Sequence, residues 1–128
     1  MTIETEWIAF DEPSYVNKLA KPRVTLSRVK KFCVGAKAFK RLGSPNAVLL
    51  FFDVRRNLIG IRAASPTTPH AVHVIRCSRD RNIGYISGGP FCNKFRIHLD
   101  HTIEFNEVQF ERDGTMILDL NTARRFAR

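Results

Sequence analysis

The chain has 128 residues, with 21 lysines and arginines against 12 aspartates and glutamates, and therefore a formal net charge of +9. A hydrophobic content of 44% and a charged content of 26% are typical of a soluble folded domain and exclude wholesale disorder. The longest purely apolar run, 47–52, is far shorter than the roughly 20 residues of a transmembrane helix, and the acidic N-terminus lacks the apolar stretch of a secretory signal. We therefore expect a single domain, residues 1–128, in the cytoplasm and away from membranes.

The cysteines favour a reducing compartment. Cys33, Cys77 and Cys92 are odd in number and form no Cys-x-x-Cys pair, which argues against a disulfide framework. Cys33 and Cys92 lie beside phenylalanines, so we expect both to be small buried hydrophobic residues. No histidine lies at a diagnostic spacing, which argues against a cysteine nucleophile.

The charge is distributed unevenly along the chain. Residues 18–62 contain twelve basic residues and one acid, Asp53, whereas residues 98–120 contain six acids and one base, Arg112. Such asymmetry predicts a polyanionic partner. The alternatives are that the basic and acidic segments neutralise each other in the fold, or that the charge serves only solubility.

The first elements are short. We expect a helix over 13–19, which Pro22 would end, and then strands at 24–26 and 32–34. Over 36–42 the apolar residues recur at helical spacing while the cations occupy the opposite side, and the glycine that follows is a natural C-terminal cap.

A hairpin and a linker complete the first half. The apolar run 48–52 predicts a strand that is buried on both faces. Residues 53–57 are expected to form a hairpin turn, from which the strand 58–62 returns. Two prolines within 65–70 interrupt any strand ladder and predict a linker.

The second half begins with the strands 72–75 and 83–86, which flank a polar turn. Residues 87–90 then open a short helix. The alternation over 103–110 contains one extra residue, which predicts a β-bulge near 106–107.

The chain closes with a hairpin and a tail. Asp113-Gly114 is a strong signal for a two-residue hairpin turn, and the apolar residues of 116–120 are expected to form the returning strand. Residues 121–128 are predicted to be a flexible basic tail, either a frayed helix or disordered.

The two halves, 23–64 and 71–120, share an order of strand, glycine-marked turn, short helix, long strand, hairpin turn and strand. Each half has too few strands to bury its own faces, but two copies packed together could close a small barrel. We therefore expect a β-rich α+β fold, a small barrel built from two strand–short helix–hairpin repeats.

The run Phe32-Cys33-Val34-Gly35-Ala36-Lys37-Ala38-Phe39-Lys40-Arg41-Leu42-Gly43, followed by 48–53 and 58–62, carries a family resemblance. Over residues 31–62 the chain resembles the AbrB-like swapped-hairpin domain of transition-state regulators and antitoxins. The resemblance implies a dimer of interleaved hairpins that binds DNA through arginines and lysines. A degenerate second copy would supply the dimer partner within one chain.

The resemblance and the charge together predict a DNA-binding protein, a transcriptional regulator that acts on double-stranded DNA through a basic surface without catalysis. Several cations on one surface suffice for non-specific binding by counterion release. Eight residues form the predicted surface: Arg28, Lys30, Lys31, Lys37, Lys40, Arg41, Arg55 and Arg56.

No catalytic or metal-binding pattern competes with this hypothesis. The spacings His70-x-x-His73 and His98-x-x-His101 match no zinc pattern, and no Ser-His-Asp or Cys-His set has informative spacing. We expect no enzyme activity, cofactor or metal.

The alternative is a protein-interaction module without nucleic acid. Its acidic strand face, 104–111, would meet a basic partner or the basic face of a second copy in a homodimer. Trp7 and Phe10 would be either an anchor for the partner or part of a strand that seals the core.

Overall fold

The computed structural model describes residue 8, residues 21–105 and residues 107–126. The helix predicted over 13–19, like Trp7 and Phe10, lies outside the described residues. The two helices and ten strands of the described chain are β1 (Val24–Leu26), β2 (Lys31–Val34), α2 (Ala36–Leu42), β3 (Ala47–Asp53), β4 (Leu58–Ala64), β5 (Val72–Arg76), β6 (Gly84–Ser87), α3 (Gly89–Lys94), β7 (Ile103–Glu104), β8 (Val108–Phe110), β9 (Met116–Asp119) and β10 (Arg124–Arg125).

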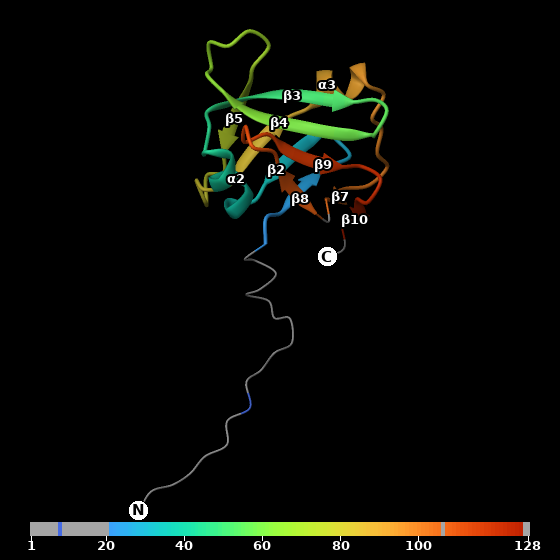
Figure 1. Cartoon of the computed structure of the whole chain (residues 1–128), viewed down its shortest axis with the longest axis horizontal. Helices are drawn as coiled ribbons and strands as arrows, with labels where there is room; N and C mark the ends of the chain where they lie inside the picture. Colours follow the sequence, from blue (N-terminus) through green and yellow to red (C-terminus); the bar gives the residue numbers. More distant parts are fainter. Residues whose placement is uncertain (1–7, 9–20, 106, 127–128) are drawn as a thin grey trace, which may run out of the picture.

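The strands form one antiparallel sheet in the order β10-β7-β1-β2-β6-β5-β3-β4-β9-β8. The sheet curls around a single core, with α2 and α3 at different ends of the molecule (Figure 1). The β-rich α+β class predicted from the sequence is confirmed. The order also shows that the two halves of the chain interleave, since β2 pairs with β6, β5 with β3, and β4 with β9.

The hairpins are arranged in two matching sets of four strands. In the first set, hairpin β1–β2 joins hairpin β5–β6 through the pair β2–β6. In the second set, hairpin β3–β4 joins hairpin β8–β9 through the pair β4–β9. Each set therefore contains one hairpin from each half of the chain, joined through the second strands of the two hairpins.

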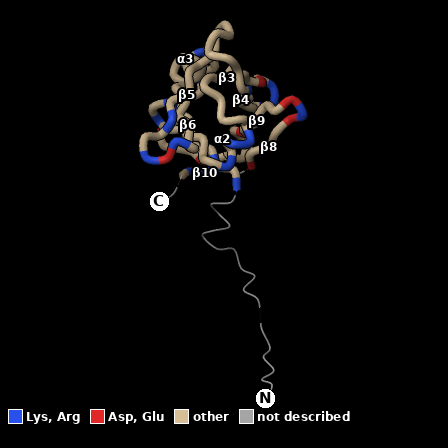
Figure 2. The backbone as a smooth tube through the Cα atoms, turned by 90° about the vertical axis from the view of Figure 1, so that its left-hand side faces the viewer, with Lys and Arg blue, Asp and Glu red and all other residues tan. Residues whose placement is uncertain are grey.

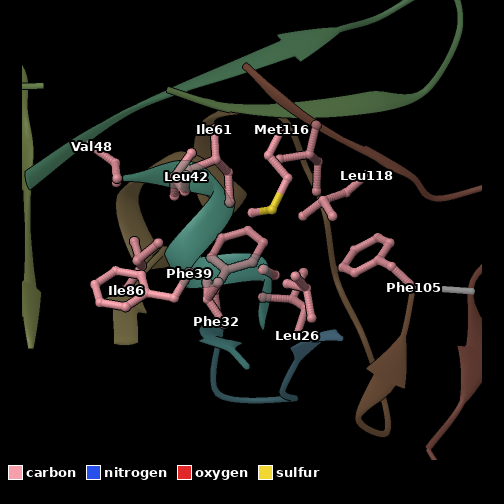
Figure 3. Close-up of a cluster of buried hydrophobic side chains, with 14 of the residues drawn as sticks. Leu26, Phe32, Phe39, Leu42, Val48, Ile61, Ile86, Phe105, Met116 and Leu118 are labelled. Atoms are coloured by element: carbon pink, nitrogen blue, oxygen red, sulfur yellow. The ribbon is translucent and has the colours of Figure 1, made fainter. Parts of the chain in front are cut away.

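The core is built by alternation along the strands. Phe32 and Val34 of β2 are fully buried, while Lys31 and Cys33, which alternate with them, point to the outer side. From α2, Phe39 and Leu42 project into the same cluster (Figure 3). The helix predicted over 36–42 is confirmed with its bounds, and Gly43 ends it in the left-handed conformation at φ +100.

The strand predicted over 48–52 forms, but the expectation that it is buried on both faces is wrong. Val48 and the alternate residues Leu50 and Phe52 belong to the core, whereas the side chain of Phe51 is 41% exposed on the outer face. Arg62 covers part of the Phe51 ring on that outer face, with its guanidinium carbon 4.8 Å from the ring centroid.

The segment predicted as one bulged strand over 103–110 is two strands. β7 pairs with β1 and β10, whereas β8 pairs with β9, so the partners change between Glu104 and Val108. Asn106 lies outside the described residues. The described part of the tail is also different from the prediction, because Arg124–Arg125 form a strand and the Phe126 amide donates to the Thr102 carbonyl at 2.8 Å.

Candidate nucleic-acid interface

Strand register brings three separate segments to one end of the sheet. Val24 pairs with Val34, Val34 with Gly84, and Gly84 with Arg76, so these residues form a row across β1, β2, β6 and β5. The chain enters β1 just before this row, continues into α2 just after it, and turns from β5 to β6 beyond it. These three segments, 21–23, 35–44 and 76–83, therefore lie together.

We call this region the basic end. The seven cations that define it are Lys21, Lys37, Lys40, Arg41, Arg76, Arg79 and Arg81. Within the three segments Asp80 is the only acid. An eighth cation, Arg23, is ion-paired with Glu104 at 2.7 Å and is not counted. Figure 2 views the molecule from this side and shows Lys and Arg segments on α2 and near β5 and β6.

The helix α2 contains no acidic residue and presents one face to solvent. Its buried residues are Ala38, Phe39 and Leu42, and its exposed face carries Lys37, Lys40 and Arg41. Because the same seven-residue helix is anchored in the core by an aromatic ring, the three cations are held on a fixed backbone.

Two arginines connect α2 to the neighbouring strands. The guanidinium of Arg76 donates to the Ser44 carbonyl at 2.7 Å, and its central carbon lies 5.1 Å from the Phe39 ring centroid. The guanidinium carbon of Arg41 lies 4.3 Å from the Phe110 ring centroid.

The structure places the other predicted cations elsewhere. Arg28, Lys30 and Lys31 lie at the opposite end of β1 and β2, beyond the pair Leu26–Phe32. There Lys30 contacts the Asn93 side chain, and the ammonium of Lys31 lies 4.2 Å from the Tyr85 ring centroid.

Arg55 and Arg56 lie on the tip of the β3–β4 hairpin. The seven residues of β3 separate this tip from α2, which at about 3.3 Å per residue is about 20 Å. Asp53 and Asp119 both pair with Leu58 at this tip, so the local charge is balanced. Of the eight residues predicted from sequence, the structure brings together Lys37, Lys40 and Arg41, and it does not bring the other five to them.

Sequence reasoning missed four members of the basic end. Lys21, Arg76, Arg79 and Arg81 flank predicted strands or lie in a predicted polar turn, but no local pattern shows that this turn reaches α2. The placement follows from the pairing of the strands β2 and β6, which are distant in the chain and whose pairing no local signal gives.

The predicted acidic face over 104–111 does not lie on one strand. Glu104 is engaged with Arg23, and Glu111 follows a strand with different pairing partners. The acidic protein-interaction module, the alternative function, therefore has no single strand to carry its acidic face. Glu107 and Glu111 are nevertheless exposed.

The histidines and carboxylates of the described chain do not gather into a metal site. No group of three or more His, Cys, Asp or Glu residues among the described residues could hold an ion. Over the same residues, neither helix combines the length and the apolar character that crossing a membrane requires. In comparisons with family models, curated proteins and solved structures, the chain matches none of them.

Proposed function

We propose that the protein binds DNA through the basic end and acts as a regulator without catalysis. The observation that carries the proposal is the convergence of seven cations from three segments, with Asp80 as the only acid among them. A polyanion that contacts several fixed cations releases its counterions, which favours binding independently of base sequence. Double-stranded DNA is the expected partner because its phosphates are the most densely spaced.

The salt dependence of binding follows from the number of contacts. If six of the seven cations contact phosphates, the affinity should fall about a thousandfold between about 50 and about 200 mM salt. A plot of log affinity against log salt concentration would then have a slope of about −5.

The testing experiment reverses three charges at each end of the molecule. The variant K37E/K40E/R41E changes the basic end, and the control R28E/R55E/R56E changes the opposite end by the same total charge. We expect the first variant to lose at least about a hundredfold in affinity for a labelled duplex, with a flatter salt slope, and the control to lose much less. Fluorescence anisotropy at several salt concentrations measures both.

Two results would contradict the assignment. Equal losses in both variants would indicate that only net charge matters, and a larger loss in the control would place the surface at the opposite end. Circular dichroism of each variant checks that the fold is unchanged.

We also propose that the halves 23–64 and 71–120 are degenerate copies of one swapped-hairpin unit, so that the chain contains its own dimer partner and closes a barrel. This is supported by the two matching sets of four strands. The helix α3 ends in a single cation, Lys94, where α2 carries three. The DNA site is therefore expected to be one-sided, and a footprint over a non-palindromic stretch would support this.

A further inference from the structure

A hollow opens within the basic end. It has a volume of about 430 Å³ and lies where the chain before β1, the first residues of α2 and the β5–β6 turn meet. Lys21 and Lys37 line it from two of these segments, and Phe126 lines it from the end of the described chain. This volume falls in the range of about 300–1,000 Å³ that is usual for sites that hold small organic groups.

The lining combines an apolar interior with cations. Cys33 and Ile83 contribute to the apolar part, and burial raises the pKa of the Cys33 thiol, which keeps that sulfur neutral. Asp80 also lines the hollow and offers a carboxylate to an N–H donor. A ligand that matches this lining has a flat apolar ring, hydrogen-bond donors at its edge and a negative charge attached nearby.

The ring of Phe126 adds a stacking surface. The guanidinium carbon of Arg23 lies 6.0 Å from the Phe126 ring centroid, and Glu104 holds that guanidinium at 2.7 Å. The Phe126 amide donates to the Thr102 carbonyl, which fixes the backbone that carries the ring. Aromatic rings beside a track of cations are the usual means by which proteins bind the bases of a single strand.

We propose that this hollow takes an unpaired nucleobase of the bound DNA, with the neighbouring phosphates on Lys21 and Lys37. The inference rests on the proposed function, because the basic end must first hold the strand. A base inside a duplex has both faces covered by its neighbours, so only a base that is unpaired or extruded can enter. The hollow therefore adds affinity for a strand or a duplex that presents an unpaired base, beyond the phosphate contacts that a fully paired duplex of the same charge makes.

The test compares two single strands with the same number of phosphates. One is a ten-nucleotide oligothymidine, and the other is an abasic strand of the same length. We expect the protein to bind the thymidine strand about tenfold more tightly, because base stacking on an aromatic ring is absent from the abasic strand. The salt slopes of the two strands should be equal, since both offer the same phosphates.

Two variants change the hollow in opposite ways. F126A removes the stacking ring, and A36W fills the hollow from the first, exposed position of α2. Their controls are F51A, which removes another aromatic ring beside an arginine, and A63W, which adds an indole at an exposed position of β4. We expect F126A and A36W to lose the preference for thymidine while keeping the salt slope, and both controls to keep the preference.

The outcomes separate the two proposals. Equal affinity of the wild-type protein for both strands, with a steep salt slope, would overturn the base site and leave the basic end standing. No salt-dependent binding of any strand or duplex would overturn both. Thymidine monophosphate that competes as strongly as the whole strand would overturn the strand assignment, because the hollow would then be a site for a free nucleotide.

Discussion

The three cysteines have different surroundings in the fold, and two of them, Cys33 and Cys92, differ although both follow a phenylalanine in the sequence. Cys92 is fully buried, and burial raises its pKa. Cys33 is half-buried rather than buried as predicted, because it points to the outer side of β2. Cys77 lies at the start of the β5–β6 turn, where the backbone amides of Asp80 and Arg79 stabilise the thiolate and lower its pKa.

These surroundings predict an order of reactivity. The thiolate is the nucleophile, so Cys77 should be alkylated first, Cys33 more slowly, and Cys92 only on unfolding. As the pH falls from about 9, Cys77 should continue to react at pH values at which Cys33 no longer does. The lowered pKa of Cys77 keeps part of it as the thiolate at those pH values, whereas the raised pKa of Cys33 leaves it as the neutral thiol.

Peptide mapping by mass spectrometry after timed exposure to iodoacetamide measures the order of reaction. The variant C77S is the control, since it should remove the fast phase and leave the slower phases unchanged. Modification of Cys92 ahead of Cys77 in the folded protein would contradict the assignment.

At the level of elements, the position of α2 depends on a glycine in a distant strand. A β-carbon added at Gly84 would lie 2.8 Å from Cε1 of Phe39 and 3.0 Å from a methyl group of Val74. Phe39 is fully buried, so its ring has no open space into which to move. The glycine of β6 therefore permits the close approach of α2 to the sheet.

This contact predicts a destabilised G84A variant. Overpacking at such a site costs roughly 1–3 kcal/mol in the free energy of unfolding, and displacement of α2 should also weaken DNA binding. The control is G89A in α3, where an added β-carbon has no neighbour within 4 Å. Urea denaturation followed by circular dichroism measures both, and a midpoint for G84A equal to that of G89A would contradict the packing argument.

The elements that could be predicted from sequence are those with local signals. The helix over 36–42 follows from the spacing of its apolar residues, and the hairpin at Asp113-Gly114 follows from its turn residues; both are confirmed. The hairpin loop is longer than the predicted two residues, since β8 ends at Phe110 and β9 begins at Met116. The split between β7 and β8 could not be predicted, because it depends on which distant strand each pairs with. The same is true of Phe51, whose exposure depends on what covers the outer face of β3.

At the scale of the molecule, the curled sheet separates cations that are close in sequence and gathers cations that are distant. Arg55 follows Arg41 by fourteen positions, but β3 carries the chain across the molecule between them. Arg79 is much further along the chain and yet lies at the same end as α2. Which cations share a surface depends on strand register, which charge counts along the sequence do not contain.

The interleaving of the halves predicts that neither half folds alone. A cut between Thr67 and Thr68, in the turn that links β4 to β5, would give fragments 1–67 and 68–128. In the first fragment β2 would lack β6, and β4 would lack β9. Both strands would then expose unpaired backbone groups, and the fragment would expose the core residues that the second half covers. Each fragment as a monomer should therefore show no cooperative thermal transition.

The equimolar mixture should recover the spectrum and the DNA affinity of the whole chain, because the linker at 65–70 lies outside the sheet and joins strands that are already positioned by β3. Circular dichroism and analytical ultracentrifugation of the fragments, alone and mixed, measure this. A single fragment that melts cooperatively while monomeric would contradict the interleaving, since its strands would then have found all their partners within one half. Recovery only on mixing would mean that the row Val24–Val34–Gly84–Arg76, on which the basic end depends, is completed by its one pair between the halves, Val34–Gly84.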